Sequence, residues 1–268
     1  MDKENSYSAT LLINKMYRPR VIPTLLLRNL GLVKTVRFKD HRYIGDPINA
    51  VKLFNDLKAD ELVFLDILAG KEKRTVSLNF VERVGDEANM PIAVGGGIRS
   101  LRDIRNILKA GAEKVVINSY AGENPDFIKS ASNEFGSSTI VVCIDFRRKL
   151  FGKPTVYINN GTTPLSYNPV DFARIMEKNG AGEIIINSIN HDGMMDGYDI
   201  DVLREISDKI TVPIVALGGA GNISDLRKAI KEGHASATAA GSLFIYHGPR
   251  KAVLINYPTQ EELIDLFV

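Results

Sequence analysis

The chain has 268 residues, of which 25% are charged, and its net charge of +2 excludes the strongly basic surface of a nucleic-acid-binding protein. The length fits one α/β barrel, and no apolar run approaches the ~20 residues of a membrane-spanning helix. The single cysteine, Cys143, excludes an internal disulfide framework and is typical of a reducing cytosol, so we expect a cytoplasmic protein.

Residues 1–17 lack the basic start and long apolar centre of a signal peptide. We interpret them as an N-terminal extension, compatible with disorder, and residues 18–268 as a single domain. The first expected strand covers 21–27 (VIPTLLL). Its continuous apolar run is typical of a strand that is covered on both faces, as in a parallel sheet.

The segment after this strand, Arg28–Pro47, is long for a connection between a strand and a helix. Its cations are Arg28, Lys34, Arg37, Lys39 and Arg42. Long loops at a barrel mouth are often lids, and a basic lid suits an anionic substrate. A solvated surface loop is the alternative.

Seven further short apolar runs follow, and amphipathic segments separate them. The pattern SLRDIRNILKAGA predicts one such helix, with Leu101, Ile104, Ile107 and Leu108 on one face and Gly111 as its stop signal. The alternation predicts parallel strands joined by helices. The runs are 61–67, 91–97, 114–119, 140–146, 183–189, 213–219 and 236–242.

An internal repeat supports a closed barrel. Residues 61–119 align with 183–241 at a constant offset of 122, so that PIAVGGGIRSLRDIRNILKAGA matches PIVALGGAGNISDLRKAIKEGH. Eight strands with intervening helices and this long repeat predict a single (β/α)8 TIM barrel built from two similar half-barrels.

Glycines and small polar residues end several strands, where the active site of such a barrel lies. Glycine lets backbone amides approach an anion closely, and the following helix start favours negative charge. Two such clusters predict two phosphate sites and a substrate with a phosphate at each end, whereas tight turns are the alternative. The clusters are Gly95–Gly97 with Asn118 and Ser119, and Gly218, Gly219 and Gly221 with Gly241, Ser242, Asp192 and Gly193.

Asp145 ends the run IVVCID, where a carboxylate can act as a general acid or base. A helix N-cap or an ion pair with Arg147 or Arg148 is the alternative, and Asp66 has the same ambiguity. His191 is expected to be a loop residue, and Cys143 a core residue. The four histidines and the cysteine show no metal-ligand spacing, and no cofactor is expected.

The motifs FLDI, VGGGIRS, GAEKVVINS, VVCIDFRR, GAGEIIINSI, DGMMDGYD and GGAGN occur in this order and spacing. From about Arg18 to Phe244 the chain resembles the cyclase subunit of imidazole glycerol phosphate synthase. The resemblance implies a barrel with a glutaminase subunit at its bottom, in a heterodimer. It also implies that ammonia passes through the barrel and reacts at the top with a bisphosphorylated aminoimidazole carboxamide ribonucleotide in histidine synthesis.

The resemblance also assigns residues. It places a catalytic aspartate at Asp145 and a lid lysine at Lys34. Four residues near strand starts, hence at the barrel bottom, correspond to a charged ammonia gate, although a salt-bridge cluster that closes the floor is the alternative. The gate is Arg20, Glu61, Lys114 and Glu183, and the phosphate residues are Gly97, Asn118, Ser119, Asp192, Gly193, Gly219, Gly241 and Ser242.

The chain departs from the family in its first strand. The family reads CLDV where this chain reads TLLL, so Leu26 stands at the position of a second catalytic aspartate. Asn190 also replaces an acid, and Leu217 a serine. This pattern resembles a divergent branch associated with surface-polysaccharide gene clusters. There the barrel and its glutaminase are thought to supply ammonia for amidination of an acetamido sugar, beside an ATP-dependent amidotransferase.

Three hypotheses follow. The leading one is an ammonia-channelling subunit that works in synthesis of an acetamidino sugar for lipopolysaccharide or a related glycan. The second is a working histidine-pathway cyclase in which Asp145 and a water or another side chain suffice. The third is a non-catalytic scaffold that activates the glutaminase. A related isomerase fits less well, because it needs no ammonia gate and also needs the acid that Leu26 replaces.

Overall fold

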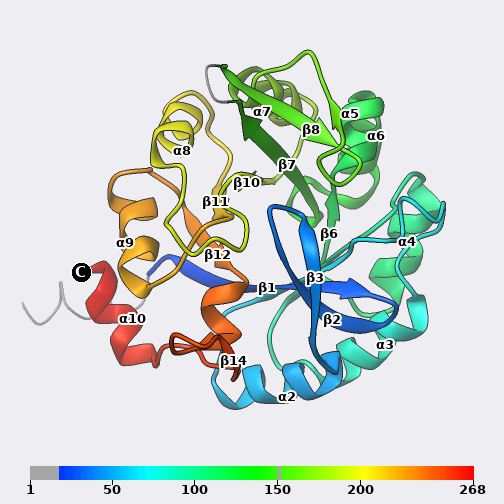
Figure 1. The fold of residues 1–268 in the computed structure, drawn as a ribbon. Helices are drawn as coiled ribbons and strands as arrows, with labels where there is room; N and C mark the ends of the chain where they lie inside the picture. The colour runs from blue at the N-terminus through cyan, green and yellow to red at the C-terminus, as the bar shows by residue number, and fades with distance from the viewer. Residues whose placement is uncertain (1–17, 150–151) are drawn as a thin grey trace, which may run out of the picture.

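The computed structural model describes residues 18–149 and 152–268, in which eight parallel strands close into a barrel (Figure 1). Neighbouring strands pair in chain order, and the pairs of β7 with β10 and of β12 with β1 complete the ring. Each strand lies inside or overlaps one of the eight apolar runs, so the TIM barrel is confirmed. The strands are β1 (Arg20–Arg28), β4 (Leu62–Asp66), β5 (Ile92–Gly95), β6 (Lys114–Ile117), β7 (Ile140–Arg148), β10 (Glu183–Ser188), β11 (Ile214–Leu217) and β12 (Ala237–Ala240). The extension expected at residues 1–17 lies outside the described residues.

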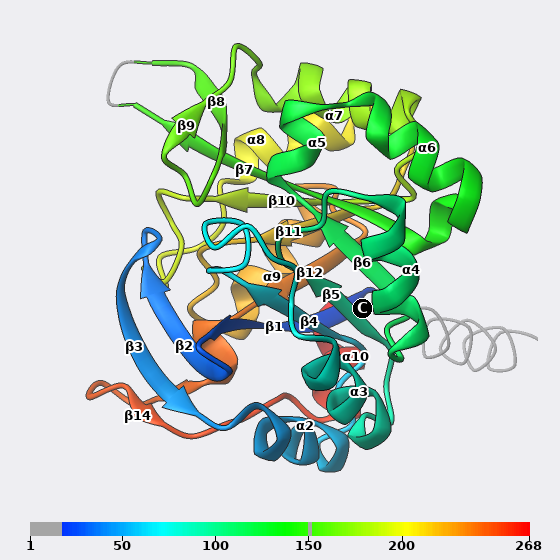
Figure 2. The same cartoon turned by 90° about the vertical axis from the view of Figure 1, so that its right-hand side faces the viewer.

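Helices surround the barrel and cover its outer face (Figures 1 and 2). The predicted amphipathic helix is α4, in which Ile104 and Ile107 are buried, and it ends just before Gly111. The helices are α2 (Pro47–Asp56), α3 (Leu78–Glu87), α4 (Leu101–Lys109), α5 (Ser119–Glu123), α6 (Asp126–Phe135), α7 (Pro169–Lys178), α8 (Ile200–Ser207), α9 (Ile223–Lys231) and α10 (Gln260–Phe267).

The repeat of the sequence is visible in the structure. Helices α4 and α9 begin and end at an offset of 122 residues, and so do β5 and β11. Both helices start with a capping box. The N-cap side chain, Ser100 in α4 and Asn222 in α9, accepts one backbone amide, and an aspartate three residues later accepts a second one. The two half-barrels therefore share their local start signals as well as their strands.

Residues 28–47 are not the long loop that the sequence predicts. They continue β1 into two antiparallel strands, β2 (Gly31–Val36) and β3 (Lys39–Gly45). The two-residue turns Asn29–Leu30 and Arg37–Phe38 have positive φ at all four residues, as tight hairpins require. Only Asn29 is a residue type that favours this conformation, so the sequence carried almost no signal for the turns.

The corresponding strand of the second half also extends into a hairpin. Strand β7 pairs antiparallel with β8 (Pro154–Ile158), which pairs with β9 (Thr163–Pro164). Figure 2 shows both extensions at the same end of the barrel. The shorter elements are β13 (Tyr246–His247), β14 (Ala252–Val253) and the 3₁₀ turns η1 (Ser137–Thr139) and η2 (Ser242–Phe244).

The core has two parts. The larger lies between the strands and the helices, and the smaller fills the barrel with residues such as Ile22, Val63 and Ile185. Cys143 belongs to this inner cluster and is buried, so its interpretation as a core residue is confirmed. In the described residues no helix is long and apolar enough to cross a membrane.

Candidate functional site

A cavity of about 640 Å³ opens at the end of the barrel where the strands finish. Active sites of such barrels lie at this end. The cavity brings together all the residues to which the resemblance assigns phosphate binding, the catalytic candidate and the lysine, whereas Gly95 and Gly221 of the glycine clusters do not line it. The residues brought together are Gly97, Asn118, Ser119, Asp192, Gly193, Gly219, Gly241, Ser242, Asp145 and Lys34.

Asp145 lies near the end of β7, where its carboxylate is buried and held on both oxygens. Asn118 Nδ2 donates to Oδ2 at 3.0 Å, and Asn187 Nδ2 donates to Oδ1 at 2.8 Å. Burial raises the pKa of Asp145 to about 7, although these amide donors favour the charged form. A carboxyl group that titrates near neutral pH can both accept and donate a proton at the cavity wall.

Neither structural alternative for Asp145 is observed. It lies inside β7, three residues before the end of the strand, so it caps no helix. The guanidinium of Arg147 stacks over the ring of Tyr157 at 4.9 Å, and Arg148 pairs with Asp199 at 3.5 Å. Asp145 is therefore an ionisable group without an ion-pair partner among the described side chains, as expected for a group that acts on a ligand.

Asp66, by contrast, has a structural environment. Its Oδ1 accepts the amides of Leu68 and Ala69, and its Oδ2 pairs with Arg74 at 2.6 Å. These contacts hold the loop after β4. His191 lies in the loop after β10, where its Nδ1 is 2.8 Å from Asp196. Asp66 therefore has the structural role of an ion-paired loop residue, and Asp145 stays the candidate for acid–base chemistry.

Leu26 lies at the end of β1 and lines the cavity. It pairs with Val33 on β2 and with Leu65 on β4. Leu65 and Leu217 also line the cavity, so its wall is apolar where the first strand ends. A leucine has no group that transfers a proton. The cavity therefore holds Asp145 but lacks the second acid that the resemblance places at the position of Leu26.

The cluster expected to bind the second phosphate offers backbone donors. Among the described residues, the amides of Gly219, Gly241 and Ser242 donate to no backbone or side-chain acceptor. A Cβ on Gly219 would lie 2.0 Å from the carbonyl oxygen of Gly197, so only glycine fits there. Free amides beside a cavity are the groups that hold a phosphate.

Asp192 also holds the hairpin over the cavity mouth. Its carboxylate accepts the hydroxyl of Thr35 at 2.8 Å and the amide of Phe38 at 3.3 Å, and its own amide donates to Ser188. Burial raises the pKa of Asp192. The β2–β3 hairpin is therefore fastened across the mouth onto the loop after β10. Gly193 permits this, because a Cβ there would lie 2.0 Å from the Thr35 carbonyl oxygen.

The cluster expected to bind the first phosphate also lines the cavity. Gly97 has a φ of +67°, and a Cβ there would lie 1.8 Å from the carbonyl oxygen of Arg74. Ser119 Oγ donates to Asn118 and accepts the amide of Asn159 at 3.0 Å. The polar groups of this cluster are thus pre-positioned by neighbours from three different strand ends.

Lys34 lies on β2 and not on a loop, and its side chain is buried at 5% exposure. Its Nζ donates to the carbonyl oxygen of Thr24 at 2.8 Å. Burial lowers the pKa of Lys34 to about 8, against the opposing effect of Asp192. The lysine predicted for the lid is therefore part of the cavity wall in this conformation.

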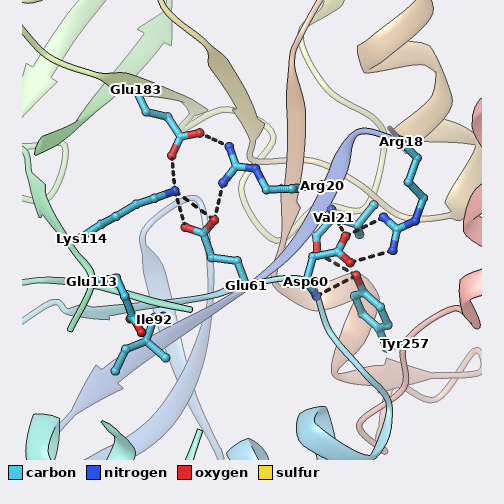
Figure 3. Close-up of polar contacts among 10 residues, drawn as sticks. All are labelled: Arg18, Arg20, Val21, Asp60, Glu61, Ile92, Glu113, Lys114, Glu183 and Tyr257. Atoms are coloured by element: carbon cyan, nitrogen blue, oxygen red, sulfur yellow. Dashed lines mark hydrogen bonds and ion pairs between the residues drawn. The ribbon is translucent and has the colours of Figure 1, made fainter. Parts of the chain in front are cut away.

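Four charged residues form a ring at the opposite end of the barrel (Figure 3). Arg20 donates to both Glu61 and Glu183, and Lys114 donates to the same two acids at 3.1 Å. The acids are almost fully buried, whereas Arg20 is 35% exposed. The sequence thus placed the charged ring correctly at the strand starts, and every member has two partners of opposite charge.

A second cluster beside the ring was missed by sequence reasoning (Figure 3). Asp60 accepts two hydrogen bonds of 2.7 Å from Arg18 and one from the amide of Val21. The hydroxyl of Tyr257 donates to the carbonyl oxygen of Val21 at 2.8 Å. These contacts fasten the C-terminal segment to the start of β1. Nothing in the local sequence predicts them, because the partners are far apart in the chain.

Asn187 was also missed, and here the sequence had a signal. The run EIIINS is buried along its whole length, and a buried polar residue needs a partner. Asn190, which the resemblance marks as a replaced acid, exchanges two hydrogen bonds with the backbone of Arg148. It therefore ties the loop after β10 to β7 and supplies no acid.

Comparison with known proteins finds relatives that span the whole barrel. Residues 20–249 match the model of a family described as "Histidine biosynthesis protein". A protein of Leptospira interrogans, described as "Putative imidazole glycerol phosphate synthase subunit HisF", is 45% identical over 253 residues, 94% of this chain and 100% of the relative.

Two further relatives have similar coverage. A protein of Pseudomonas aeruginosa, described as "Putative imidazole glycerol phosphate synthase subunit hisF2", is 43% identical over 248 residues, 92% of this chain and 99% of its own. A protein of Alkaliphilus metalliredigens, described as "Imidazole glycerol phosphate synthase subunit HisF", is 41% identical over 232 residues, 87% of this chain and 92% of its own. The similarity therefore includes both the cavity and the charged ring.

Proposed function

This chain belongs to the histidine biosynthesis protein family, as a cyclase-type subunit of the imidazole glycerol phosphate synthase kind, and we propose that it delivers ammonia to a substrate other than the histidine-pathway precursor. The ammonia comes from a glutaminase partner, and the acceptor is an acetamido sugar of lipopolysaccharide or another surface glycan. The observation that carries the proposal is Leu26 at the cavity wall, where the resemblance places an acid.

The charged ring supports the ammonia route. Its four members are fully paired at the barrel floor, and inside the barrel lie small apolar side chains such as Ala93, Ala237 and Ala239. A neutral molecule like ammonia crosses an apolar interior more easily than an ion does. The proposed partner is a glutaminase that docks on the floor beside the ring, in a heterodimer.

The cavity supports an anionic substrate. It combines two clusters of glycine and small polar residues with the cations Lys34, Lys71 and Arg99 on its wall. The proposed ligand class is a phosphorylated small molecule. In the sugar reaction, an ATP-dependent amidotransferase would activate the acetamido oxygen as a leaving group, and ammonia would replace it to give an amidine.

The test supplies the purified protein with excess ammonium salt and the bisphosphorylated aminoimidazole precursor, and follows the absorbance of the precursor. Ammonium removes the need for the glutaminase, so only the chemistry of the barrel is measured. We expect turnover more than about a hundredfold below that of a histidine-pathway cyclase, because one of two proton-transferring groups is missing. Turnover within that hundredfold would contradict the proposal.

A specific observation keeps a working cyclase as the second candidate. Asp145 is buried, held by two amides, and titrates near neutral pH, which is the state that acid–base chemistry needs. The Leu26→Asp variant separates the two candidates. If the cavity still fits the precursor, the restored acid should raise ammonium-dependent turnover. If the cavity has been remodelled for another substrate, it should not.

A further inference from the structure

A series of three hydrogen bonds joins the turn between β8 and β9 to Asp145. The backbone amide of Asn159 donates to Ser119 Oγ at 3.0 Å, and Ser119 Oγ donates to Asn118 Oδ1 at 3.1 Å. Asn118 Nδ2 then donates to Asp145 Oδ2 at 3.0 Å. All four residues line the cavity, and we call their three bonds the relay. The relay links a turn at the mouth to the carboxylate on the cavity wall.

The bonds of the relay fix the direction of each donor. The hydroxyl of Ser119 has a single proton, and because its oxygen accepts the amide of Asn159, that proton is directed to Asn118. Asn118 Nδ2 also donates to the carbonyl oxygen of Cys143 at 2.8 Å. A flipped Asn118 amide would turn its oxygen toward the carboxylate of Asp145 and lose these bonds. The hydroxyl of Ser119 therefore helps to keep the amide nitrogen of Asn118 on Asp145.

Asn118 does not perform the usual task of an asparagine at its position. It is the N-cap residue of α5, where an asparagine side chain normally accepts a backbone amide of the helix. Within the described structure its side chain makes no such capping bond, and its oxygen accepts the hydroxyl of Ser119 instead. The side chain thus supports the carboxylate of Asp145 and not the helix.

The turn at the start of the relay is strained and is held by its neighbours. Asn159, Asn160 and Gly161 have φ values of 54°, 56° and 71°, so three left-handed residues follow one another. Asn160 Nδ2 donates to the carbonyl oxygen of Ile67, in the loop after β4, at 2.7 Å, and the amide of Asn159 is held by Ser119. Strained backbone that its surroundings keep in place is typical of functional sites. The turn therefore has a reason to be rigid beside the cavity.

We propose that Ser119 and Asn159 are positioning residues for Asp145, and that an anion bound at Ser119 loosens their hold on it. A phosphate would take the hydroxyl proton of Ser119, because a charged acceptor forms a stronger hydrogen bond than a neutral amide oxygen. Asn118 then loses a bond that orients it, and the carboxylate loses part of its support. Binding of the substrate thus favours the protonated form of Asp145, which can donate a proton. This inference rests on the proposed function, since the anion is the phosphate of the proposed substrate.

The other groups around Asp145 are independent of the relay. Within the described residues, none of them bonds to the side chain of Ser119 or to Asn159, so a change at Ser119 reaches the carboxylate through Asn118. These groups are Asn187 on β10, Asp192 in the loop after β10, Cys143 and Arg147 on β7, and Tyr157, which pairs with Asp145 from β8.

The test is a ¹³C NMR titration of the Asp145 carboxyl carbon in the full chain, with Asp145→Asn to identify the signal. Ser119→Ala removes the hydroxyl, so the midpoint of Asp145 should rise by at least about half a unit, although Ser119 itself does not bond to Asp145. Ser119→Thr keeps a hydroxyl and should restore the original midpoint. Ser130→Ala, which removes an exposed hydroxyl on α6, is the matched control and should leave the midpoint unchanged.

Two further measurements test the turn and the anion. Asn160→Ala frees the turn from Ile67 and should raise the midpoint of Asp145 by less than Ser119→Ala does. Its control is Asn256→Ala, which loses a similar bond to the carbonyl oxygen of Leu254. Inorganic phosphate is the anion probe, and the backbone amide signal of Ser119 reports its binding. Phosphate should raise the midpoint of Asp145 in the unsubstituted chain, and less so in Ser119→Ala, where only the charge of the anion acts.

A midpoint in Ser119→Ala equal to that in Ser130→Ala overturns the inference, and so does a midpoint in Ser119→Thr equal to that in Ser119→Ala. Asn160→Ala equal to Asn256→Ala overturns the role of the turn. Phosphate that leaves either the Ser119 amide signal or the midpoint of Asp145 unchanged overturns the link to the anion. The proposed function is judged separately by turnover of the aminoimidazole precursor with ammonium, because the titrations need no reaction.

Discussion

The amide nitrogen of Asn187 donates a 2.8 Å hydrogen bond to Asp145 Oδ1, across the pairing of β7 with β10. Among the described residues of β10, Asn187 is the only one with an amide side chain, and this buried side chain bonds to the carboxylate that faces the cavity. It favours the charged carboxylate, whereas burial favours the neutral acid. The protonation state of Asp145 therefore depends on a residue to which the sequence motifs assigned no role.

Replacing Asn187 by alanine should raise the pKa of Asp145 further above about 7, because a donor to the charged form is lost. The measurement is a ¹³C NMR titration of the Asp145 carboxyl carbon. Asn190→Ala is the matched control, since among the described residues the side chain of Asn190 bonds only to the backbone of Arg148. An unchanged or lower midpoint in Asn187→Ala would mean that the hydrogen bond does not hold the carboxylate.

The raised pKa of Asp145 should appear as a pH dependence of stability. Because the folded pKa of about 7 lies above the usual value of 3.8, the unfolded chain releases this proton first as the pH rises. The contribution of Asp145 to the unfolding free energy is fully present below about pH 4 and is lost as the pH passes through about 7.

The unfolding free energy of Asp145→Asn should therefore be close to that of the unsubstituted chain at pH 5. At pH 8 the variant should be more stable than the unsubstituted chain by up to about 3 kcal/mol. Urea unfolding at the two pH values measures the difference. The exposed Asp201→Asn variant controls for a general change of charge. A variant that is equally destabilised at both pH values would show that Asp145 is an ordinary ionised carboxylate.

Glu61→Gln should destabilise the protein by about 2–3 kcal/mol, because it leaves Arg20 and Lys114 with one acid between them. This loss of unfolding free energy is smaller than the loss expected from breaking a fully buried ion pair, because Arg20 is partly exposed. Urea unfolding checks this, with the exposed Glu82→Gln on α3 as control. With the glutaminase present, the variant should also lose coupling between glutamine hydrolysis and use of the ammonia. Stability equal to the control would mean that the ring contributes no net energy.

Thr35→Val should loosen the hairpin over the mouth, because it removes the hydroxyl that donates to Asp192. A hydrogen bond to a charged acceptor contributes about 1.5–3 kcal/mol. Hydrogen exchange should therefore become faster in β2 and β3 and stay unchanged in the barrel strands. Thr162→Val, which removes a hydroxyl bond in the turn before β9, is the matched control. If the exchange rates of β2 and β3 in Thr35→Val equal those in Thr162→Val, contacts other than the Thr35–Asp192 bond hold the hairpin.

Much of the barrel could be predicted because its strands are covered on both faces. Such strands need continuous apolar runs, and their ends gather at one mouth, so Asp145, Gly97 and Gly241 could be assigned to a common site. The charged ring could be placed for the same reason, since strand starts gather at the floor. The internal repeat at an offset of 122 residues predicted the two similar half-barrels.

The hairpin and the supporting contacts could not be predicted. The turn at Arg37–Phe38 has positive φ at two residues that do not favour it, and it exists because the folded barrel holds Asp192 beneath it. The roles of Asp192 and Asn187 depend on pairs separated by 157 and 42 residues. Such contacts depend on the closed barrel, and no local pattern encodes them.

The pairing of β1 with β12 has a consequence for biosynthesis. Strand β1 leaves the ribosome first, but its neighbour on one side is the last strand of the barrel. Arg18 also bonds to Gln260, 242 residues later. Until translation is almost finished, one edge of the first strand has no native partner, and an unpaired edge can join another chain. We therefore expect chains truncated before β12 to aggregate, and the newly made protein to depend on chaperones during its synthesis.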